Sequence, residues 1–296
     1  MSSKTLRSYF EVTKPRTVWL LVYVAAAAGI AAYFTVEPQD NLLRNLLLLV
    51  AAVTIGSMGT NAITSYIDRR MDALMERTRH RPIPTERVTP PRRALWYGVV
   101  LMVIALFMTL LINLWAAFWY AVGVLDVAVV YNGFLKRRHP INVIAGSFGG
   151  GAPVMGAWSA MSGEAIALTP VLMAALVVLW IPIHIWSLAI RYREDYARVG
   201  VPMLPVVLGE RAAIRCVAST SILLVIFSTA LAFLMDFTIV LTSILLIGNA
   251  AILLLSIWLL ARPSGVVAWR LFKVTSPYLA AMFTLFMVGG YLKLYP

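Results

Sequence analysis

A short polar stretch between two long apolar runs contains side chains suited to metal and phosphate chemistry. It reads YIDRRMDALMERTRHRPIP, from Tyr66 to Pro84. Asp68 and Asp72 are four residues apart, so on a continuing helix both carboxylates face the same way. Two neighbouring carboxylates repel each other unless a cation or a bound proton compensates. Mg²⁺ suits such a pair, because it prefers oxygen ligands and is often held by carboxylates together with substrate phosphates.

Arginines surround this acidic pair. They are Arg69, Arg70, Arg77, Arg79, Arg81 and, just beyond, Arg87. A guanidinium group binds phosphate oxygens in bidentate fashion. An acidic pair within an arginine cluster therefore predicts a metal–diphosphate site. The alternative is a solvated loop in which the aspartates only pair with arginines.

A second polar stretch, RYREDYARVGVPMLP (191–205), has a similar composition. It offers Glu194 and Asp195 beside Arg193 and Arg198, and it ends in spaced prolines as the first stretch does. Acidic groups on two different helices could hold the two ends of one diphosphate through Mg²⁺. Glu194 alternatively points into water, because adjacent carboxylates do not share a helix face.

Other polar residues stand near or within the apolar runs. Lys136 is either a phosphate contact or part of a basic stop signal, and Asn61 and Thr64 lie within two turns of Asp68. Ionisable groups inside a membrane are costly and tend to mark function. His184 therefore ligates a haem iron, acts as an acid or hydrogen-bonds a neighbouring helix. Asp126 lies within an apolar run, where an unpaired charge is costly. It therefore faces a cavity, pairs with another group or is protonated.

The elements that must position these residues are membrane-spanning helices. The chain of 296 residues is 61% hydrophobic, with a mean hydropathy of +0.84, whereas soluble domains are about 45–50% apolar. Runs of about 18 apolar residues cross a hydrocarbon core. We predict a polytopic all-α protein with nine spans, at residues 17–36, 43–66, 94–113, 115–134, 141–161, 167–190, 214–234, 237–260 and 274–292. Residues 1–296 are expected to form one domain, with a possible duplication of a four-helix unit.

The positive charge follows the predicted topology. The net charge is +12, and with these spans Arg44 and Lys293 alone among the 25 Lys and Arg residues lie on the opposite side. By the positive-inside rule the N-terminus and both polar stretches are cytoplasmic, and the C-terminus is outside. The charge thus indicates orientation in a cell membrane and argues against a nucleic-acid partner. The single cysteine excludes an internal disulfide.

With these residues laid out, the chain resembles the UbiA-type intramembrane prenyltransferases over nearly its whole length. The similar segments are VTKPRTVWLLV (12–22), the stretch from Tyr66 to Pro84, LKRRHPINVIAG (135–146), HIWSLAIRYREDYARVGVPMLPVV (184–207) and RLFKVTSPYL (270–279). Within that superfamily it is most similar to the haem O synthase branch. It departs from the family pattern at Thr64 and Arg70, and Asp126 is not expected there.

The resemblance implies nine helices around a central cavity capped by the two polar stretches, and Mg²⁺-dependent ionisation of an allylic diphosphate. In the haem branch, farnesyl from farnesyl diphosphate joins a vinyl group of haem b and water adds. The residues expected to act are Asp68, Asp72 and Asp195 on the metal, with Asn61, Thr64, Arg79, Lys136 and Arg193 on the diphosphate and His184 toward the haem. The alternatives are a quinone-precursor or glycerophosphate lipid acceptor, and, from another class, a transporter or channel.

Overall fold

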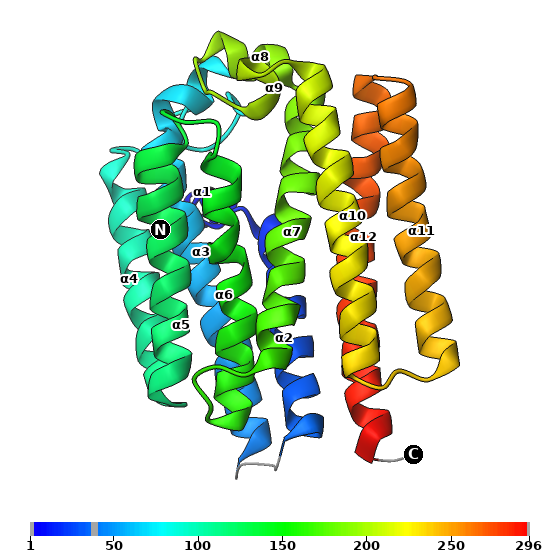
Figure 1. The fold of residues 1–296 in the computed structure, drawn as a ribbon. Helices are drawn as coiled ribbons and strands as arrows, with labels where there is room; N and C mark the ends of the chain where they lie inside the picture. Colours follow the sequence, from blue (N-terminus) through cyan, green and yellow to red (C-terminus); the bar gives the residue numbers. More distant parts are fainter. Residues whose placement is uncertain (1–2, 37–40, 295–296) are drawn as a thin grey trace.

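The computed structural model describes residues 3–36 and 41–294, and the regular elements in these two ranges are all helices (Figure 1). The elements are α1 (Ser3–Val12), α2 (Pro15–Thr35), α3 (Leu42–Leu74), α4 (Arg92–Leu110), α5 (Leu114–Leu125), the π-helix η1 (Asp126–Leu135), α6 (Asn142–Ser162), α7 (Leu168–Arg191), α8 (Arg193–Arg198), α9 (Leu204–Val207), α10 (Glu210–Leu234), α11 (Ile239–Ala261) and α12 (Gly265–Leu294). The predicted all-α class is confirmed.

Eight helical segments in the described ranges are long and apolar enough to cross a membrane, with α5 and η1 together forming one of them. The predicted count of nine is not confirmed. The predicted span 141–161 does form a helix, α6, packed against α2, α5 and α7. Its sequence contains five glycines, at 146, 149, 150, 151 and 156, which lower its hydropathy below that of the other long helices.

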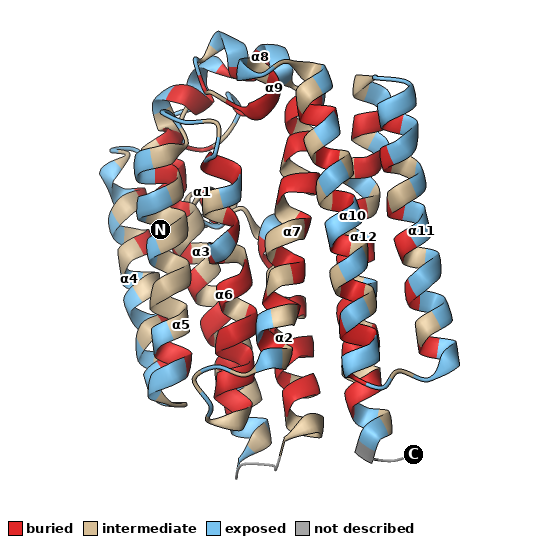
Figure 2. Ribbon diagram, viewed as in Figure 1, coloured by how far each residue is buried: buried red, intermediate tan, exposed pale blue. Residues whose placement is uncertain are grey.

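The inner helices make most of the core. Figure 2 shows buried residues concentrated along α2, α6 and α7, whereas α4 and α11 present mostly intermediate and exposed positions. Helices α2 and α12 lie side by side, as do α3 and α4, and α7 packs against both α10 and α12. In a membrane the exposed apolar side chains of the outer helices meet lipid.

The two polar stretches lie at the same end of the bundle. Helix α3 ends there, and the segment that follows it lies beside α8 and α9 at the top of Figure 1. We call this the polar-loop end, made of residues 68–91 and 191–207. Prolines shape it: Pro205 lies in the first turn of α9, where its missing N–H removes no helical bond.

Small residues bring α3 and α4 into close contact. A Cβ atom added at Gly98 would stand 2.7 Å from the Gly59 carbonyl oxygen, and one at Gly59 would stand 2.7 Å from the Gly98 carbonyl oxygen. The two backbones therefore touch at this crossing, as small residues permit between membrane helices.

The substitution Gly98→Leu should separate these helices and lower the apparent melting temperature in detergent, because overpacking a tight contact costs about 1–3 kcal/mol. Gly98→Ala should have a smaller effect of the same sign. Val100→Leu, at a position 55% exposed two residues away, is the matched control and should leave the melting temperature near that of the wild type. An unchanged melting temperature for Gly98→Leu would contradict the close packing of α3 and α4.

Candidate active site

Helix α3 runs past the apolar core and carries two aspartates into the polar-loop end. Because the helix continues to Leu74, Asp68 and Asp72 share a face, as their spacing predicts. Each residue is only 3% exposed. Carboxylates so deeply buried remain ionised only when cations or hydrogen bonds compensate for the lost water.

Basic side chains from the next polar connection compensate Asp68. Lys136, which directly follows η1, donates a hydrogen bond from Nζ to Asp68 Oδ2, and it also contacts Asn132 Oδ1 at 3.2 Å. Arg137 Nη2 lies 3.6 Å from Asp68 Oδ1. Burial is the largest single influence and lowers the pKa of Lys136, but the charge and hydrogen bond of Asp68, together with Tyr131 and Tyr196, outweigh it and raise the pKa above its ordinary value. Lys136 is therefore a fixed positive charge at this site.

Asp72 is compensated by an arginine from its own loop. Arg81 Nη1 donates to both carboxylate oxygens, at 2.9 and 2.8 Å. Thr78 fixes the turn between them, because its hydroxyl donates to the Asp72 backbone carbonyl oxygen at 3.1 Å. The predicted diphosphate contact Arg79 has an exposed side chain; Arg81, two residues later, is the arginine that reaches the acidic pair.

The second polar stretch contributes Asp195 on α8. Asp195 is 8% exposed and accepts from Arg198 Nη1 at 3.4 Å. Its neighbour Arg193, predicted as a diphosphate contact, is exposed. Each of the three predicted metal-binding carboxylates thus lies beside a basic side chain.

Contacts between the two polar stretches join them into one region. The Arg77 guanidinium lies over the Tyr192 ring, 5.6 Å from its centroid, at a distance typical of a cation–π contact. Tyr196, next to Asp195, acts electrostatically on Lys136. The segments around residues 68 and 195 therefore lie on the same side of the bundle, as the sequence predicts.

The metal site remains a prediction. In the described ranges no group of three or more His, Cys, Asp or Glu side chains lies close enough together to hold a metal ion. The donor chemistry nevertheless fits a hard cation. Asp68 Oδ1 is buried and accepts no hydrogen bond, and Arg137 approaches it only to 3.6 Å, so this carboxylate oxygen still has an unused hydrogen-bonding lone pair. A carboxylate oxygen of this kind is what Mg²⁺ prefers.

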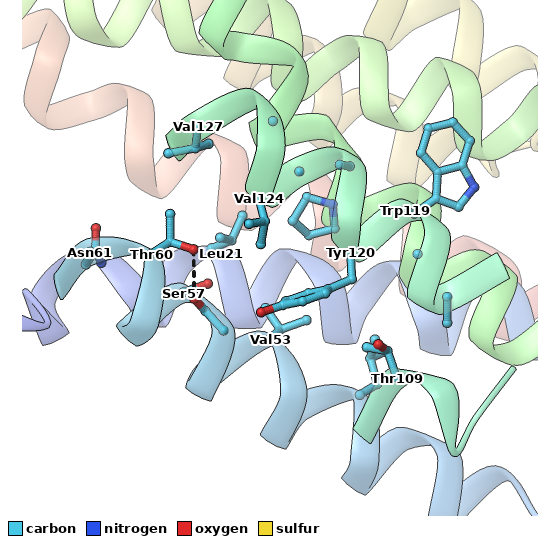
Figure 3. A pocket seen from close by; sticks show the side chains of 18 of the residues that line it. Leu21, Val53, Ser57, Thr60, Asn61, Thr109, Trp119, Tyr120, Val124 and Val127 are labelled. Carbon is cyan, nitrogen blue, oxygen red and sulfur yellow. Dashed lines mark hydrogen bonds between the residues drawn. The ribbon is translucent and has the colours of Figure 1, made fainter. Parts of the chain in front are cut away.

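An apolar cavity of about 260 Å³ lies inside the bundle (Figure 3). Helices α2 to α6 and η1 supply its wall, with Tyr120 among the lining residues. Asn61 and Trp119 lie toward opposite ends of the cavity in Figure 3. Asn61 is seven residues before Asp68 on α3, which corresponds to about 10 Å along a helix. The Asn61 end of the cavity is therefore the end nearer the acidic pair.

Asn61 and Thr64 bind the N-terminal segment. Asn61 Nδ2 donates to the Thr17 hydroxyl at 3.2 Å, and Lys14 Nζ donates to the Thr64 hydroxyl at 3.3 Å. Lys14 adopts a left-handed conformation, with φ of 51°, immediately before α2. Burial and then nearby Arg81 lower the pKa of Lys14 to about 8, against the attraction of Asp68 and Asp72. In the sequence, Lys14 counted only toward the positive-inside pattern. Its place in VTKPR, directly before an apolar run, was the one signal that could have marked it as a buried residue of the site.

Two further polar residues predicted from the sequence lie inside the bundle. His184 on α7 contacts Thr275 of α12 at 2.7 Å through Nδ1. Asp126 begins η1, and its Oδ2 accepts a hydrogen bond from the Gly149 backbone N–H of α6 at 2.7 Å. Of the alternatives open for Asp126, pairing with a neighbouring helix is the one observed.

Breaking the buried ion pair at Lys136 should destabilise the fold. Lys136→Met should lower the free energy of unfolding by about 3–5 kcal/mol, because it leaves Asp68 charged and buried. Adding Asp68→Asn should recover most of that loss, measured as the apparent melting temperature in detergent. The control is Arg138→Met, at an exposed arginine that stacks on Phe134. If the double variant is no more stable than Lys136→Met alone, the two side chains are not coupled.

The lowered pKa of Lys14 should appear in the pH dependence of stability. The ordinary lysine pKa is 10.5, so between pH 8 and 10.5 the unfolded chain binds more protons here than the folded chain, and stability rises with pH. The wild type should therefore gain stability relative to Lys14→Met across this window. The matched substitution of exposed Lys273 should show no such gain. Parallel pH curves for the wild type and Lys14→Met would overturn this prediction.

Known proteins are similar to this chain over nearly its whole length. A family model described as the UbiA prenyltransferase family matches residues 14–288. A protoheme IX farnesyltransferase of Desulforudis audaxviator is 46% identical, covering 98% of this chain and 90% of that protein. A protoheme IX farnesyltransferase of Thermoplasma volcanium is 38% identical, covering 97% and 99%.

Solved structures share the fold at lower identity. A UbiA homologue from Aeropyrum pernix, in its apo form, has a TM-score of 0.72 at 20% identity and covers 94% of this chain and 98% of its own. A UbiA homologue from Archaeoglobus fulgidus bound to GPP and Mg²⁺ has a TM-score of 0.67 at 15% identity, covering 94% and 99%. The full-length family match and the identity to curated relatives lead to one conclusion: this chain is a multi-pass membrane protein that belongs to the UbiA prenyltransferase family.

Proposed function

We propose that this protein transfers the farnesyl group of farnesyl diphosphate to a vinyl group of haem b, with addition of water, to give haem O. The carbon–oxygen bond of the allylic diphosphate breaks, and diphosphate leaves with the electron pair. The vinyl group forms a carbon–carbon bond to the farnesyl carbon, hydroxide from water adds to its other carbon, and a proton is released. The names of the relatives from Desulforudis and Thermoplasma support this acceptor and donor.

The observation that carries the proposal is the set of buried ion pairs near one end of an apolar cavity. Asp68 and Asp72 are buried against Lys136 and Arg81, and the cavity begins about two helical turns below them. A prenyl diphosphate has the same two-part chemistry, a polyanionic head and a long apolar tail. We assign the head to the ion pairs and the tail to the cavity.

Asp68, Asp72 and Asp195 are the residues that would hold Mg²⁺. Bound there, Mg²⁺ would neutralise charge on the departing diphosphate oxygens. Homologues of the same fold bound to GPP and Mg²⁺, and to DMAPP and Mg²⁺, support a divalent ion with a prenyl diphosphate. Lys136 and Arg81, the cations already present, would bind diphosphate oxygens, with Lys14, Arg79 and Arg193 around them.

Binding would then proceed by exchange of partners. Asp68 now accepts from Lys136, and Asp72 accepts both of its short contacts from Arg81. When substrate and metal enter together, each carboxylate would exchange its basic partner for the metal, and each base would exchange its carboxylate for a diphosphate oxygen. Asp68 and Asp72 would then hold the metal and Lys136 and Arg81 the diphosphate, so each charge would again have a partner of opposite sign and the large cost of a lone buried ion would be avoided.

The cavity would protect the reacting carbon. Its wall is formed mainly by apolar and small residues, with hydroxyl and amide groups such as those of Ser57, Thr60 and Asn61 toward one end. Positive charge developing on the allylic carbon is quenched by any water that reaches it, so excluding water directs the carbon to the acceptor. We further propose, from the distribution of basic residues, a cell-membrane location with the polar-loop end cytoplasmic.

The test is to identify the product formed by purified protein with farnesyl diphosphate, Mg²⁺ and haem b. Mass spectrometry should show a porphyrin heavier by one farnesyl group and one hydroxyl group, with release of one diphosphate per turnover. Asp68→Ala should reduce product by at least about 100-fold, as expected when charge stabilisation at the reacting centre is removed. Arg138→Met, at an exposed arginine of the same connection, is the matched control.

Unmodified porphyrin in the presence of confirmed haem binding would contradict the proposed acceptor. In that case, parallel reactions with a quinone precursor and with a glycerophosphate lipid identify a prenyltransferase of another specificity. Flux of solute across vesicles without diphosphate release would contradict prenyl transfer altogether.

A further inference from the structure

The cavity in the bundle is longer than the donor assigned to it. On α3 its lining residues run from Asn61, at the end nearer the acidic pair, to Leu49. These two positions are twelve residues apart, which corresponds to about 18 Å of helix. Asp68 lies about 10 Å beyond Asn61 on the same helix. Asp68 and the far end of the cavity are therefore about 28 Å apart along α3.

A farnesyl group would fill only part of this length. Its three isoprene units contribute twelve main-chain bonds, and an extended chain spans about 3.5 Å for every three bonds, so the group reaches about 14 Å. With the diphosphate at Asp68 and Asp72, the last carbons would lie near Gly56, which is twelve residues or about 18 Å from Asp68. Tyr120 marks this depth, because a Cβ atom added at Gly56 would stand 2.5 Å from the Tyr120 ring.

The cavity continues beyond Tyr120. In Figure 3, Thr109 and Trp119 lie on the side of Tyr120 that faces away from the acidic pair. Leu49 also lines this side, seven residues or about 10 Å further along α3 than Gly56. The Thr109 hydroxyl is already engaged, because it donates to a backbone carbonyl oxygen of its own helix at 2.8 Å. This part of the cavity, which we call the far part, therefore offers an apolar ligand a mainly apolar wall.

Trp119 bounds the far part of the cavity. Its indole N–H donates to the Ala165 backbone carbonyl oxygen at 2.8 Å, and the Phe118 ring meets it edge-to-face at 5.2 Å. Gly156 of α6 lies beside it. A Cβ atom at Gly156 would stand 3.4 Å from Trp119 Cβ and 3.7 Å from the Ala116 carbonyl oxygen, which are ordinary van der Waals distances. A side chain would thus fit here without moving the backbone, so its absence leaves cavity space empty.

We propose that the far part of the cavity binds the fourth isoprene unit of geranylgeranyl diphosphate, and that Trp119 and Gly156 set the longest prenyl group that the protein accepts. A fourth unit adds four bonds, or about 5 Å, and the distance from Gly56 to Leu49 is about 10 Å. Burying the added carbons favours the longer donor. The inference rests on the proposed function for the position of the diphosphate but not for the acceptor. The bonds made and broken at the first carbon are those already described.

The test is a binding competition without an acceptor. Full-length protein in detergent is equilibrated with Mg²⁺ and equal amounts of farnesyl and geranylgeranyl diphosphates, and the ligands that remain with the protein are quantified by mass spectrometry. The wild type should retain at least as much geranylgeranyl as farnesyl diphosphate. Gly156→Leu should lower this ratio at least about 10-fold, because a filled pocket no longer admits the end of the longer ligand, and Gly156→Ala should lower it less. Since both donors compete for the same molecules, the ratio does not depend on how much of a variant is folded.

Two further variants make the comparison specific. Ile144→Phe adds volume at a position of the same helix that is 42% exposed, and it should keep the wild-type ratio. Trp119→Ala should have the opposite effect to Gly156→Leu and raise the bound share of a donor with five isoprene units.

The outcomes separate this inference from the proposed reaction. If Gly156→Leu keeps the wild-type ratio, or if the wild type excludes geranylgeranyl diphosphate, the length assignment is wrong, whether or not farnesylated porphyrin is formed. If the ratio falls as expected but haem is not modified, the length assignment stands and the proposed acceptor is wrong. Retention of neither donor would contradict both.

Discussion

Two carboxylates that are almost inaccessible to water set the conditions for the rest of this structure. Asp68 and Asp72 are 3% exposed at the end of a helix that has just crossed an apolar core. An isolated buried carboxylate is so costly that it must be paired or protonated. The polar-loop end meets this demand with Lys136 and Arg81, which come from different connections of the chain. The two aspartates can therefore stay ionised only when the loops that carry Lys136 and Arg81 are folded in place.

The same arrangement connects the fold to the chemistry. Replacing a buried ion pair by well-packed apolar residues is often neutral or stabilising, so such a pair is weak evidence for a purely structural role. Here the paired groups lie beyond one end of a cavity whose wall is largely apolar and glycine-rich. A ligand with a polyanionic head and an apolar tail matches both parts, because its head can bind the basic groups and its tail can fill the apolar cavity. Asp68 and Asp72 are compensated by Lys136 and Arg81 in the structure, and the proposed exchange of partners would keep each charge compensated once such a ligand binds.

The sequence predicted the helices better than it predicted which side chains contact each other. Helix identity and the shared face of Asp68 and Asp72 follow from apolar length and a four-residue spacing, both local properties. The choice of Arg81 over Arg79 depends on a turn closed by Thr78, which composition does not reveal. Lys14 reaches Thr64 across fifty residues of sequence, and only the packing of α2 against α3 brings them together.

Two other differences have the same origin. The span at α6 was predicted as one of nine apolar runs, yet its glycines serve close helix packing and reduce its hydropathy below that of the eight other long helical segments. Asp126 was unexplained in sequence terms because its partner is a backbone N–H of another helix, at Gly149, and a backbone group carries no sequence signal. By contrast, the approach of the two polar stretches followed from topology alone, since both were predicted on one side of the membrane.

The measurement that tests the exchange of charged partners most directly is a structure of this protein with Mn²⁺ and a non-hydrolysable farnesyl diphosphate analogue, located by anomalous scattering. The account predicts a Mn²⁺ peak within bonding distance of Asp68 and Asp72, with Lys136 and Arg81 moved from the carboxylates onto diphosphate oxygens. A bound diphosphate with the Asp68–Lys136 and Asp72–Arg81 pairs intact, and the metal peak elsewhere, would contradict it.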